Sequence, residues 1–240
     1  KRAATVISFH ALGWLAGIAA AGITNDLKLI FLISAASFVI GFLFTIKLPN
    51  PTQEKELNPG TTKTVILKNK FLFLSLLLRH IGAAAVWTIL PIMIVEKLGG
   101  ELYHISIVYV ANTMAAFILM NVMASKIHLS NVTKFKIGVG CTTFVFIGLS
   151  VVTEWWMAMP FMALVGATWA FLFIGGNFHL MENNPRSTST GIFSSTLSIA
   201  TVIGPVIAGS IAFLFDYVAV MYFAIAIIIV AFVVSLKIKK

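Results

Sequence analysis

Long apolar stretches leave this chain little freedom in how it can fold. Eight of them carry few or no charged residues, and each has the length, about 17–25 residues, that an α-helix needs to cross the hydrocarbon core of a bilayer. Only 10% of the 240 residues are Asp, Glu, Lys or Arg, whereas soluble domains carry about 25%. So few charges cannot cover a water-soluble fold of this size, and the sequence therefore predicts an integral membrane protein. The stretches are 3–24, 29–46, 71–95, 105–125, 137–153, 157–180, 191–214 and 218–236.

The apolar stretches predict helices rather than strands. A strand of a membrane barrel alternates apolar and polar residues over about ten positions, but runs such as "FAIAIIIVAFVVSL" show no alternation. A helix satisfies all of its own backbone hydrogen bonds in lipid. The predicted fold class is therefore all-α, a polytopic helical membrane protein with eight transmembrane helices.

The basic residues indicate the orientation of the helices. The formal net charge of +9 does not indicate a nucleic-acid-binding protein, because the basic residues lie in short gaps between apolar stretches and not on a soluble face with interleaved aromatics. All of the 17 Lys and Arg residues except Lys28, Lys97 and Arg79 fall on one side if successive helices cross in alternation. Cytoplasmic loops are enriched in Lys and Arg. We therefore expect both ends of this chain to face the cytoplasm, with the plasma membrane as the simplest location.

Signatures of enzymes and of metal sites are missing from the sequence. Cys141 is the single cysteine, so no disulfide framework and no cysteine metal cluster can form. There is no His-Glu-x-x-His zinc motif and no Gly-x-Ser-x-Gly nucleophile turn. His179 and Glu182 share a helix face, but Pro185 shortly afterwards favours a solvated helix end over a metal site. We expect neither enzymatic activity nor a metal or other cofactor.

One polar connector divides the chain. Residues 47–70, "KLPNPTQEKELNPGTTKTVILKNK", form the longest polar segment, and they separate two apolar stretches from six. The predicted organisation is a pair of helices in 1–46, a cytoplasmic connector in 47–70 and a six-helix bundle in 71–240. The first stretch begins almost at once, and the chain starts with Lys1. We therefore expect a truncated chain.

The first and seventh stretches resemble each other. Each has an arginine at one end, two glycines five residues apart and an aspartate at the other end, and the glycines of the seventh follow those of the first by 187 residues. Six crossings lie between them, and a repeat of six spans predicts two six-helix halves related by an axis along the membrane normal. The matching residues are Arg2, Gly17, Gly22 and Asp26 in the first stretch, and Arg186, Gly204, Gly209 and Asp216 in the seventh.

In the order of these features the chain resembles the major facilitator superfamily. The segment "RSTSTGIFSSTLSIATVIGPVIAG" is similar to the eleventh helix of that family, and "GAAAVWTILPIMIVEKLGG" is similar to its seventh. The connector 47–70 matches the loop between the two halves of the family fold. The eight stretches then resemble helices five to twelve of a twelve-helix, two-bundle protein, and the resemblance implies four further N-terminal helices upstream of Lys1.

The resemblance also implies a function. Members of this superfamily are secondary active transporters that move small molecules by alternating access, and proton-coupled efflux of a small lipophilic compound is our preferred subtype. The partners implied are the substrate, protons, the lipid bilayer and the upstream helices. Ile18 stands where antiporters of the family often carry a proline, which departs from the antiporter pattern. Two alternatives stay open: a non-transporting membrane sensor or scaffold, and an intramembrane enzyme.

Polar side chains inside the apolar stretches mark candidate cavity helices. They occur on the first, third, fourth, sixth and seventh stretches, whereas the second and eighth carry no ionisable group and no amide. The fifth carries only Thr142 and Thr143, hydroxyls that can bond to their own helix. In the resembled fold the same five helices line the central cavity. The candidate substrate or cavity residues are His10, Arg79, His80, Asn112, Asn177, Ser194 and Ser195.

Arg79 is the strongest candidate because a charge inside hydrocarbon costs about 2.5–3.5 kcal/mol on insertion scales. It contacts either an anionic or polar substrate or a carboxylate of the upstream helices, or else its long stem lets the guanidinium snorkel to water. His80 is a step of about 100° around the helix from Arg79, so the two are expected to face different directions. His80 and His10 are candidates for proton coupling, with packed neutral imidazoles as the alternative.

A second group of residues is expected to serve gating or packing. Arg186 lies at the membrane edge, where it holds a gate or a lipid phosphate or simply sets topology. The small residues let membrane helices approach closely, and the proline bends its helix. Trp87 and Trp169 either line a pocket for a lipophilic substrate or pack between helices. The gating and packing candidates are Arg186, Gly17, Gly22, Gly204, Pro205 and Gly209.

Overall fold

The described part of the chain is helical and has no strands. The computed structural model describes residues 2–24, 26–47, 59–125 and 127–239. The predicted all-α fold class is thereby confirmed. The helices are α1 Arg2–Thr24, α2 Leu27–Ile46, α3 Pro59–Lys68, α4 Lys70–Glu96, α5 Leu102–Ser125, α6 Asn131–Ser150, α7 Ala158–Asn183, α8 Arg186–Leu214 and α9 Tyr217–Leu236, with a short 3-10 turn, η1, at Trp155–Met157.

Each of the eight predicted apolar stretches lies on its own long helix. Seven of these helices are long and apolar enough to cross a membrane, and within the residues whose side chains are described α1 contributes a shorter apolar segment, Phe9–Thr24. This composition is consistent with an integral membrane protein.

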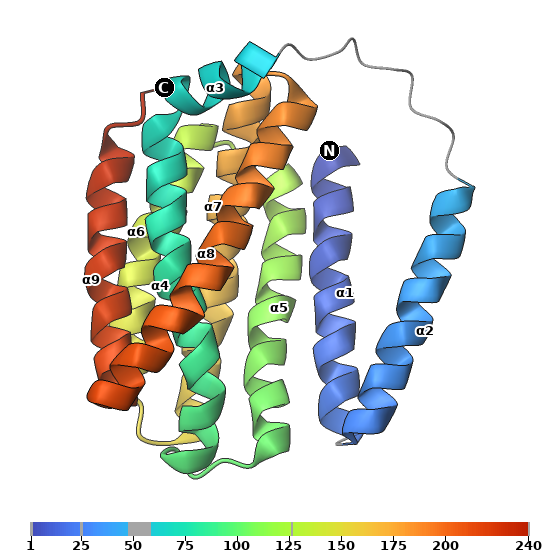
Figure 1. The fold of residues 1–240 in the computed structure, drawn as a ribbon, viewed down its shortest axis with the longest axis vertical. Coiled ribbons are helices and arrows are strands. Elements are labelled where there is room, and N and C mark those ends of the chain that lie inside the picture. Colours follow the sequence, from blue (N-terminus) through green and yellow to red (C-terminus); the bar gives the residue numbers. More distant parts are fainter. Residues whose placement is uncertain (1, 25, 48–58, 126, 240) are drawn as a thin grey trace.

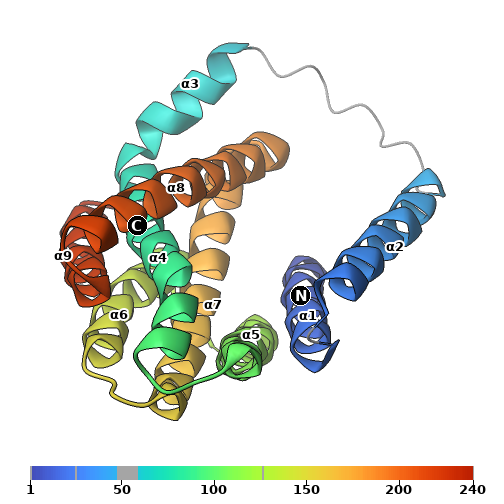
Figure 2. The ribbon, with the colours of Figure 1, turned by 60° about the horizontal axis from the view of Figure 1, so that its bottom comes forward.

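The long helices run alternately up and down, and six of them, α4 to α9, form a bundle (Figure 1). The central helix α4 packs against α8 and α9, while α7 packs against α5 and α6 (Figure 2). The first and last helices of the bundle are joined by a hydrogen bond of 2.8 Å from Ser75 Oγ on α4 to the backbone oxygen of Ala231 on α9. The bundle is therefore closed by segments 156 residues apart.

Helices α1 and α2 form a hairpin beside the bundle. The α1 helix lies along α5, and Ala11 packs there against Ala116 and Met120. The α2 helix turns away from the bundle (Figures 1 and 2), and none of its apolar window is buried in the described chain. An exposed apolar surface of this size is unsuited to water, so lipid or further protein must cover α2.

The connector predicted over 47–70 contains a helix that was not predicted. Residues 48–58 of the connector lie outside the described residues, but Pro59–Lys68 forms α3, which crosses the end of the bundle (Figure 1). Proline is well suited to the first helical position, and Lys68 in the last turn favours the helix dipole. Val65 is 2% exposed and anchors α3 to the core of the bundle.

Two members of the sequence repeat have the same structural role. Asp26 precedes α2, and its carboxylate accepts a hydrogen bond of 2.9 Å from the backbone N–H of Lys28. Asp216 precedes α9, and its carboxylate accepts one of 2.7 Å from the backbone N–H of Ala219. Aspartate is among the best residues for capping a helix start, with a contribution of about 1 kcal/mol. The two repeated aspartates therefore each start the helix that follows.

Glycines let the helices around α7 approach backbone to backbone. A Cβ added at Gly138 on α6 would lie 2.5 Å from the backbone nitrogen of Leu172 and 2.7 Å from the backbone oxygen of Thr168, both on α7. A Cβ added at Gly166 on α7 would overlap the backbone oxygen of Asn112 on α5. Because backbone atoms cannot move aside as a side chain can, these contacts require glycine.

We expect Gly138→Ala to destabilise the bundle. The added methyl group meets backbone atoms of α7, and overpacking of this kind costs about 1–3 kcal/mol. The apparent Tm of the purified protein in detergent, followed by circular dichroism at 222 nm, should fall by several degrees. Gly41→Ala on α2 is the matched control, since nothing lies within 4 Å of a Cβ there, and it should leave Tm unchanged or slightly raised. Equal Tm values for the two variants would contradict the packing described here.

Candidate functional site

Arg79 lies in the interior of the six-helix bundle and is 0% exposed. Its Nε and Nη2 donate to the hydroxyl oxygen of Thr142 on α6, at 3.4 and 3.2 Å. The Thr142 hydroxyl in turn donates to the backbone oxygen of Gly138 at 2.6 Å. The guanidinium carbon lies 5.6 Å from the centre of the Trp169 ring on α7, a cation–π distance. The guanidinium therefore does not snorkel to the surface of the described chain.

The charge of Arg79 is not neutralised by any described residue. Among the described residues no carboxylate pairs with it, and its Nη1 has no hydrogen-bond partner. The adjacent His80 is 4% exposed, and its Nδ1 also has no partner. Most buried polar atoms in folded proteins are hydrogen-bonded. Two unpartnered polar atoms on adjacent residues of one helix therefore mark this part of α4 as unusual.

Trp169 contacts both Arg79 and His80, although the two residues were expected to face different directions. The His80 ring lies 5.4 Å from the Trp169 ring and 5.2 Å, edge-on, from the Trp87 ring. The two side chains do leave α4 at different angles, but the indole of Trp169 is large enough to meet both. Of the two tryptophans considered in the sequence, Trp169 is thus the one that joins the buried polar residues.

Trp169 also lines a small cavity between α1, α5 and α7. Its volume is about 20 Å³, room for about one water molecule. The cavity combines aromatic and apolar walls with an imidazole and an amide. Its lining residues are His10, Ala11, Trp14, Asn112, Thr113, Ala116, Met120, Trp169 and Phe173.

Two of the predicted cavity residues, His10 and Asn112, meet at this cavity. They come from helices about a hundred residues apart, and the His10 ring lies 5.3 Å from that of Trp14 on the same helix. Arg79 and His80 contact Trp169 but do not line the cavity. The structure therefore brings four predicted residues into one neighbourhood, with Trp169 as the wall between two pairs.

Three other candidates lie elsewhere. Asn177 is 2% exposed and donates from its Nδ2 to the backbone oxygen of Phe173, 3.2 Å away on its own helix. Ser194 and Ser195 lie on an exposed part of α8 and outside the cavity. Among the predicted cavity residues only Arg79 and His80 on α4 and Asn177 on α7 are thus buried, whereas Asn112 on α5 is half-buried and His10 on α1 is exposed.

Of the four glycines predicted to serve packing, two lie against a neighbouring helix and two do not. A Cβ at Gly204 on α8 would lie 2.7 Å from the backbone oxygen of Ile81 on α4, and one at Gly22 would overlap Ser106 on α5. At Gly17 and Gly209 nothing lies within 4 Å. The first stretch therefore packs closely at its second glycine, Gly22, whereas the seventh packs closely at its first, Gly204. The remaining two candidates are Arg186, exposed at the start of α8, and the half-buried Pro205, which lies inside α8.

Sequence reasoning missed Thr142 as the acceptor for Arg79. Its hydroxyl was expected to bond its own helix, which it does, but the same oxygen also accepts from the guanidinium. The available signal was a threonine in an otherwise apolar stretch. Glu182 was grouped with His179 as a possible helix-face pair, and its Oε1 accepts a hydrogen bond of 2.6 Å from Asn131 Nδ2 on α6. Among the described residues no group of three or more His, Cys, Asp or Glu side chains is placed to hold a metal.

No protein-family model matches this chain, and a search of curated proteins finds no match either.

We expect Arg79→Met to leave the fold at least as stable as that of the unmodified protein. The substitution removes a buried charge without an acid partner in the described chain, and replacing buried ionic groups by apolar ones is often neutral or stabilising by about 1–4 kcal/mol. Thr142→Val, in contrast, keeps the charge and removes its acceptor, so the apparent Tm should fall, with a loss of about 1–3 kcal/mol. Thr143→Val is the neighbouring control. An Arg79→Met protein as unstable as Thr142→Val would show that Arg79 is retained for structure.

Proposed function

We propose that this chain belongs to a secondary active transporter of the major-facilitator type, which moves a small molecule across a membrane by alternating access. In this proposal α1, α2 and α4 to α9 are eight transmembrane helices of a twelve-helix fold. The end of the bundle rich in Lys and Arg faces the cytoplasm, and the protein lies in the plasma membrane. The sequence resemblance and the repeated Asp26 and Asp216 caps support this architecture.

One observation carries the functional proposal: a polar and aromatic cavity lies where the α1–α2 hairpin meets the six-helix bundle. In a transporter that rocks one helix bundle against another, the substrate site lies between the moving parts. The cavity holds about 20 Å³, too little for a substrate. It must therefore widen by movement of α1 away from α5 and α7, and we assign the structure to a closed state.

The chemistry of the cavity favours a small lipophilic compound with a polar or negatively charged group. Trp14, Trp169 and Phe173 offer aromatic surface, while His10 and Asn112 offer hydrogen bonds. The unneutralised Arg79 lies one indole ring behind the wall. At an effective dielectric constant near 20, the guanidinium charge attracts an anion about 10 Å away by on the order of 1–2 kcal/mol. Proton-coupled efflux would use His10, the ionisable residue that lines the cavity.

Opening of the α1–bundle interface is testable without knowing the substrate. In a Cys141→Ser background, Ala11→Cys places a thiol on the cavity at a position that is 6% exposed. Because alternating access opens this interface, a membrane-impermeant maleimide should label that thiol, with labelling measured by mass spectrometry. Ala83→Cys, at a bundle position that is 0% exposed, is the matched control and should remain unlabelled. An Ala11→Cys thiol as protected as the control would contradict the proposal.

Transport itself is tested in vesicles containing the purified protein. We expect saturable flux for at least one member of a panel of labelled aromatic acids, amines and neutral aromatic compounds, with the acids favoured. His10→Leu and Asn112→Leu should each reduce that flux about tenfold or more, because a lost polar contact in a cavity is worth about 1–3 kcal/mol. Ser210→Ala, on the exposed part of α8, should not. A folded protein that moves no member of the panel would argue for a sensor or scaffold.

A further inference from the structure

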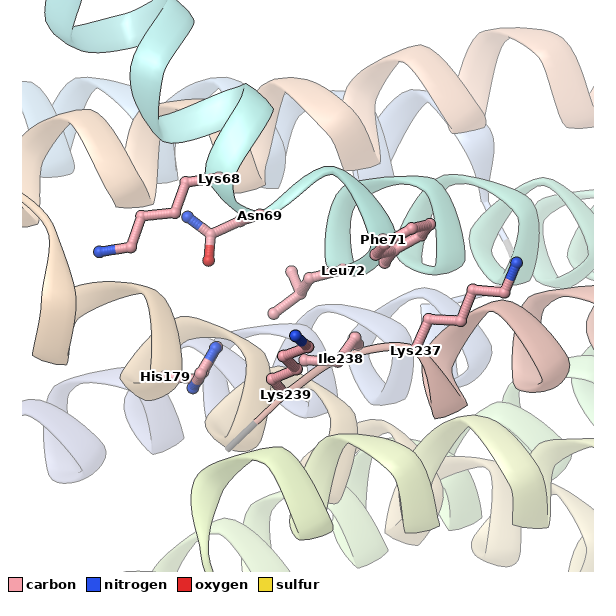
Figure 3. A pocket seen from close by; sticks show the side chains of 8 residues that line it. All are labelled: Lys68, Asn69, Phe71, Leu72, His179, Lys237, Ile238 and Lys239. Carbon is pink, nitrogen blue, oxygen red and sulfur yellow. The ribbon is translucent and has the colours of Figure 1, made fainter.

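A second, larger pocket lies at the end of the bundle where α4 begins. It has a volume of about 440 Å³ and is formed by three segments far apart in sequence: the α3–α4 junction, the end of α7 and the tail that follows α9 (Figure 3). It is separate from the cavity at Trp169. The lining residues are Lys68, Asn69, Phe71, Leu72, His179, Lys237, Ile238 and Lys239.

The pocket is basic. Three lysines and a histidine line it, and no carboxylate is among its lining residues. Two charged residues, Lys68 and Glu182, lie close enough to His179 to interact with it electrostatically. Glu182 is one turn further along α7. The hydrogen bond of Glu182, however, is made to Asn131 on α6. Like charges held together repel one another, so an anion that enters this pocket relieves the repulsion.

The tail that carries two of the lysines, Lys237 and Lys239, is held in place by the fold. Ile238 is 8% exposed and packs in the same core cluster as Leu72, which anchors the tail between its two lysines. Lys136 on α6 donates from its Nζ to the backbone oxygen of Ile238 at 3.0 Å. The Nζ of Lys237 lies 5.6 Å from the centre of the Phe71 ring. The tail therefore cannot relieve the repulsion by moving away as a free chain end would.

The position of the pocket indicates the kind of anion. It lies at the ends of α4, α7 and α9, three helices long and apolar enough to cross a membrane. Phe71, Leu72 and Ile238 give it an apolar part beside the ammonium groups. Basic pockets between membrane helices at this level suit phosphorylated lipid headgroups.

We propose that this pocket binds the phosphate headgroup of an anionic membrane lipid. The Lys68, Lys237 and Lys239 ammonium groups bind the phosphate, while the apolar residues contact the start of the acyl chains. The Nδ2 of Asn69 donates to the backbone oxygen of Val65 at 2.9 Å, so this side chain holds the α3–α4 junction at the edge of the pocket (Figure 3). This site is independent of the proposed transport activity.

The test is a thermal shift of the purified chain in detergent with a short-chain lipid. We expect dihexanoylphosphatidylglycerol at about ten times its dissociation constant to raise the apparent Tm by about 3–6 °C, and dihexanoylphosphatidylcholine to have a much smaller effect. The triple variant K68Q/K237Q/K239Q should lose at least half of the rise. All three lysines are exposed, so the variant should keep the Tm and elution volume of the unliganded protein.

A control variant distinguishes binding in the pocket from diffuse attraction of the lipid by the other basic residues at this end of the bundle. K47Q/K63Q removes exposed basic residues outside the pocket and should keep the full shift. A loss in this variant as large as in the triple variant would overturn the proposal in favour of diffuse attraction. An equal rise with the phosphatidylcholine would overturn it as well. An equal rise with inorganic phosphate at the same concentration would overturn the lipid assignment.

Discussion

The backbone contacts of α7 with its two neighbours are the constraint on which the rest of the bundle depends. Gly166 lets α5 approach α7, and Gly138 lets α6 approach it. Neither contact leaves room for a side chain, so the distance and rotation of these helices are fixed together. The same fixed rotation directs Trp169 between the buried Arg79 and the cavity at α1. Packing by small residues therefore determines where the polar residues of three other helices can meet.

The positions of the helices could be predicted from the sequence, whereas the face that each helix buries could not. Length and lack of charge were sufficient to find all eight long helices, because lipid demands a continuous apolar run. The buried face of each helix has no such signature, since lipid is as apolar as a packed interior and no polar stripe marks the outside. Ser194 and Ser195 were therefore grouped with Asn177, although they are exposed and Asn177 is buried. The contact of Thr142 with Arg79 joins positions 63 residues apart, and no periodicity along one helix encodes it.

The first and seventh apolar stretches, which resemble each other in sequence, show which of their shared residues have the same role. Asp26 and Asp216 both cap the next helix, a role that depends only on the local turn. The paired glycines do not act alike, because Gly22 and Gly204 pack closely while Gly17 and Gly209 have open space. Helix packing depends on the partner, and the partners of α1 and α8 in the described chain are different helices. Similar glycine spacing is thus compatible with two different interfaces.

The place of Arg79 on α4 has a consequence for biosynthesis. A ribosome makes the chain from its N-terminus, so α4 enters the membrane before Thr142 on α6 and Trp169 on α7 exist. During that interval the guanidinium has none of the neighbours described above, and the insertion machinery must accept a helix with an uncompensated charge. The neighbouring Ser75 must wait still longer, because its acceptor lies on α9. The nascent α4 therefore depends on a chaperone or a water-filled vestibule until α6 and α7 have been made.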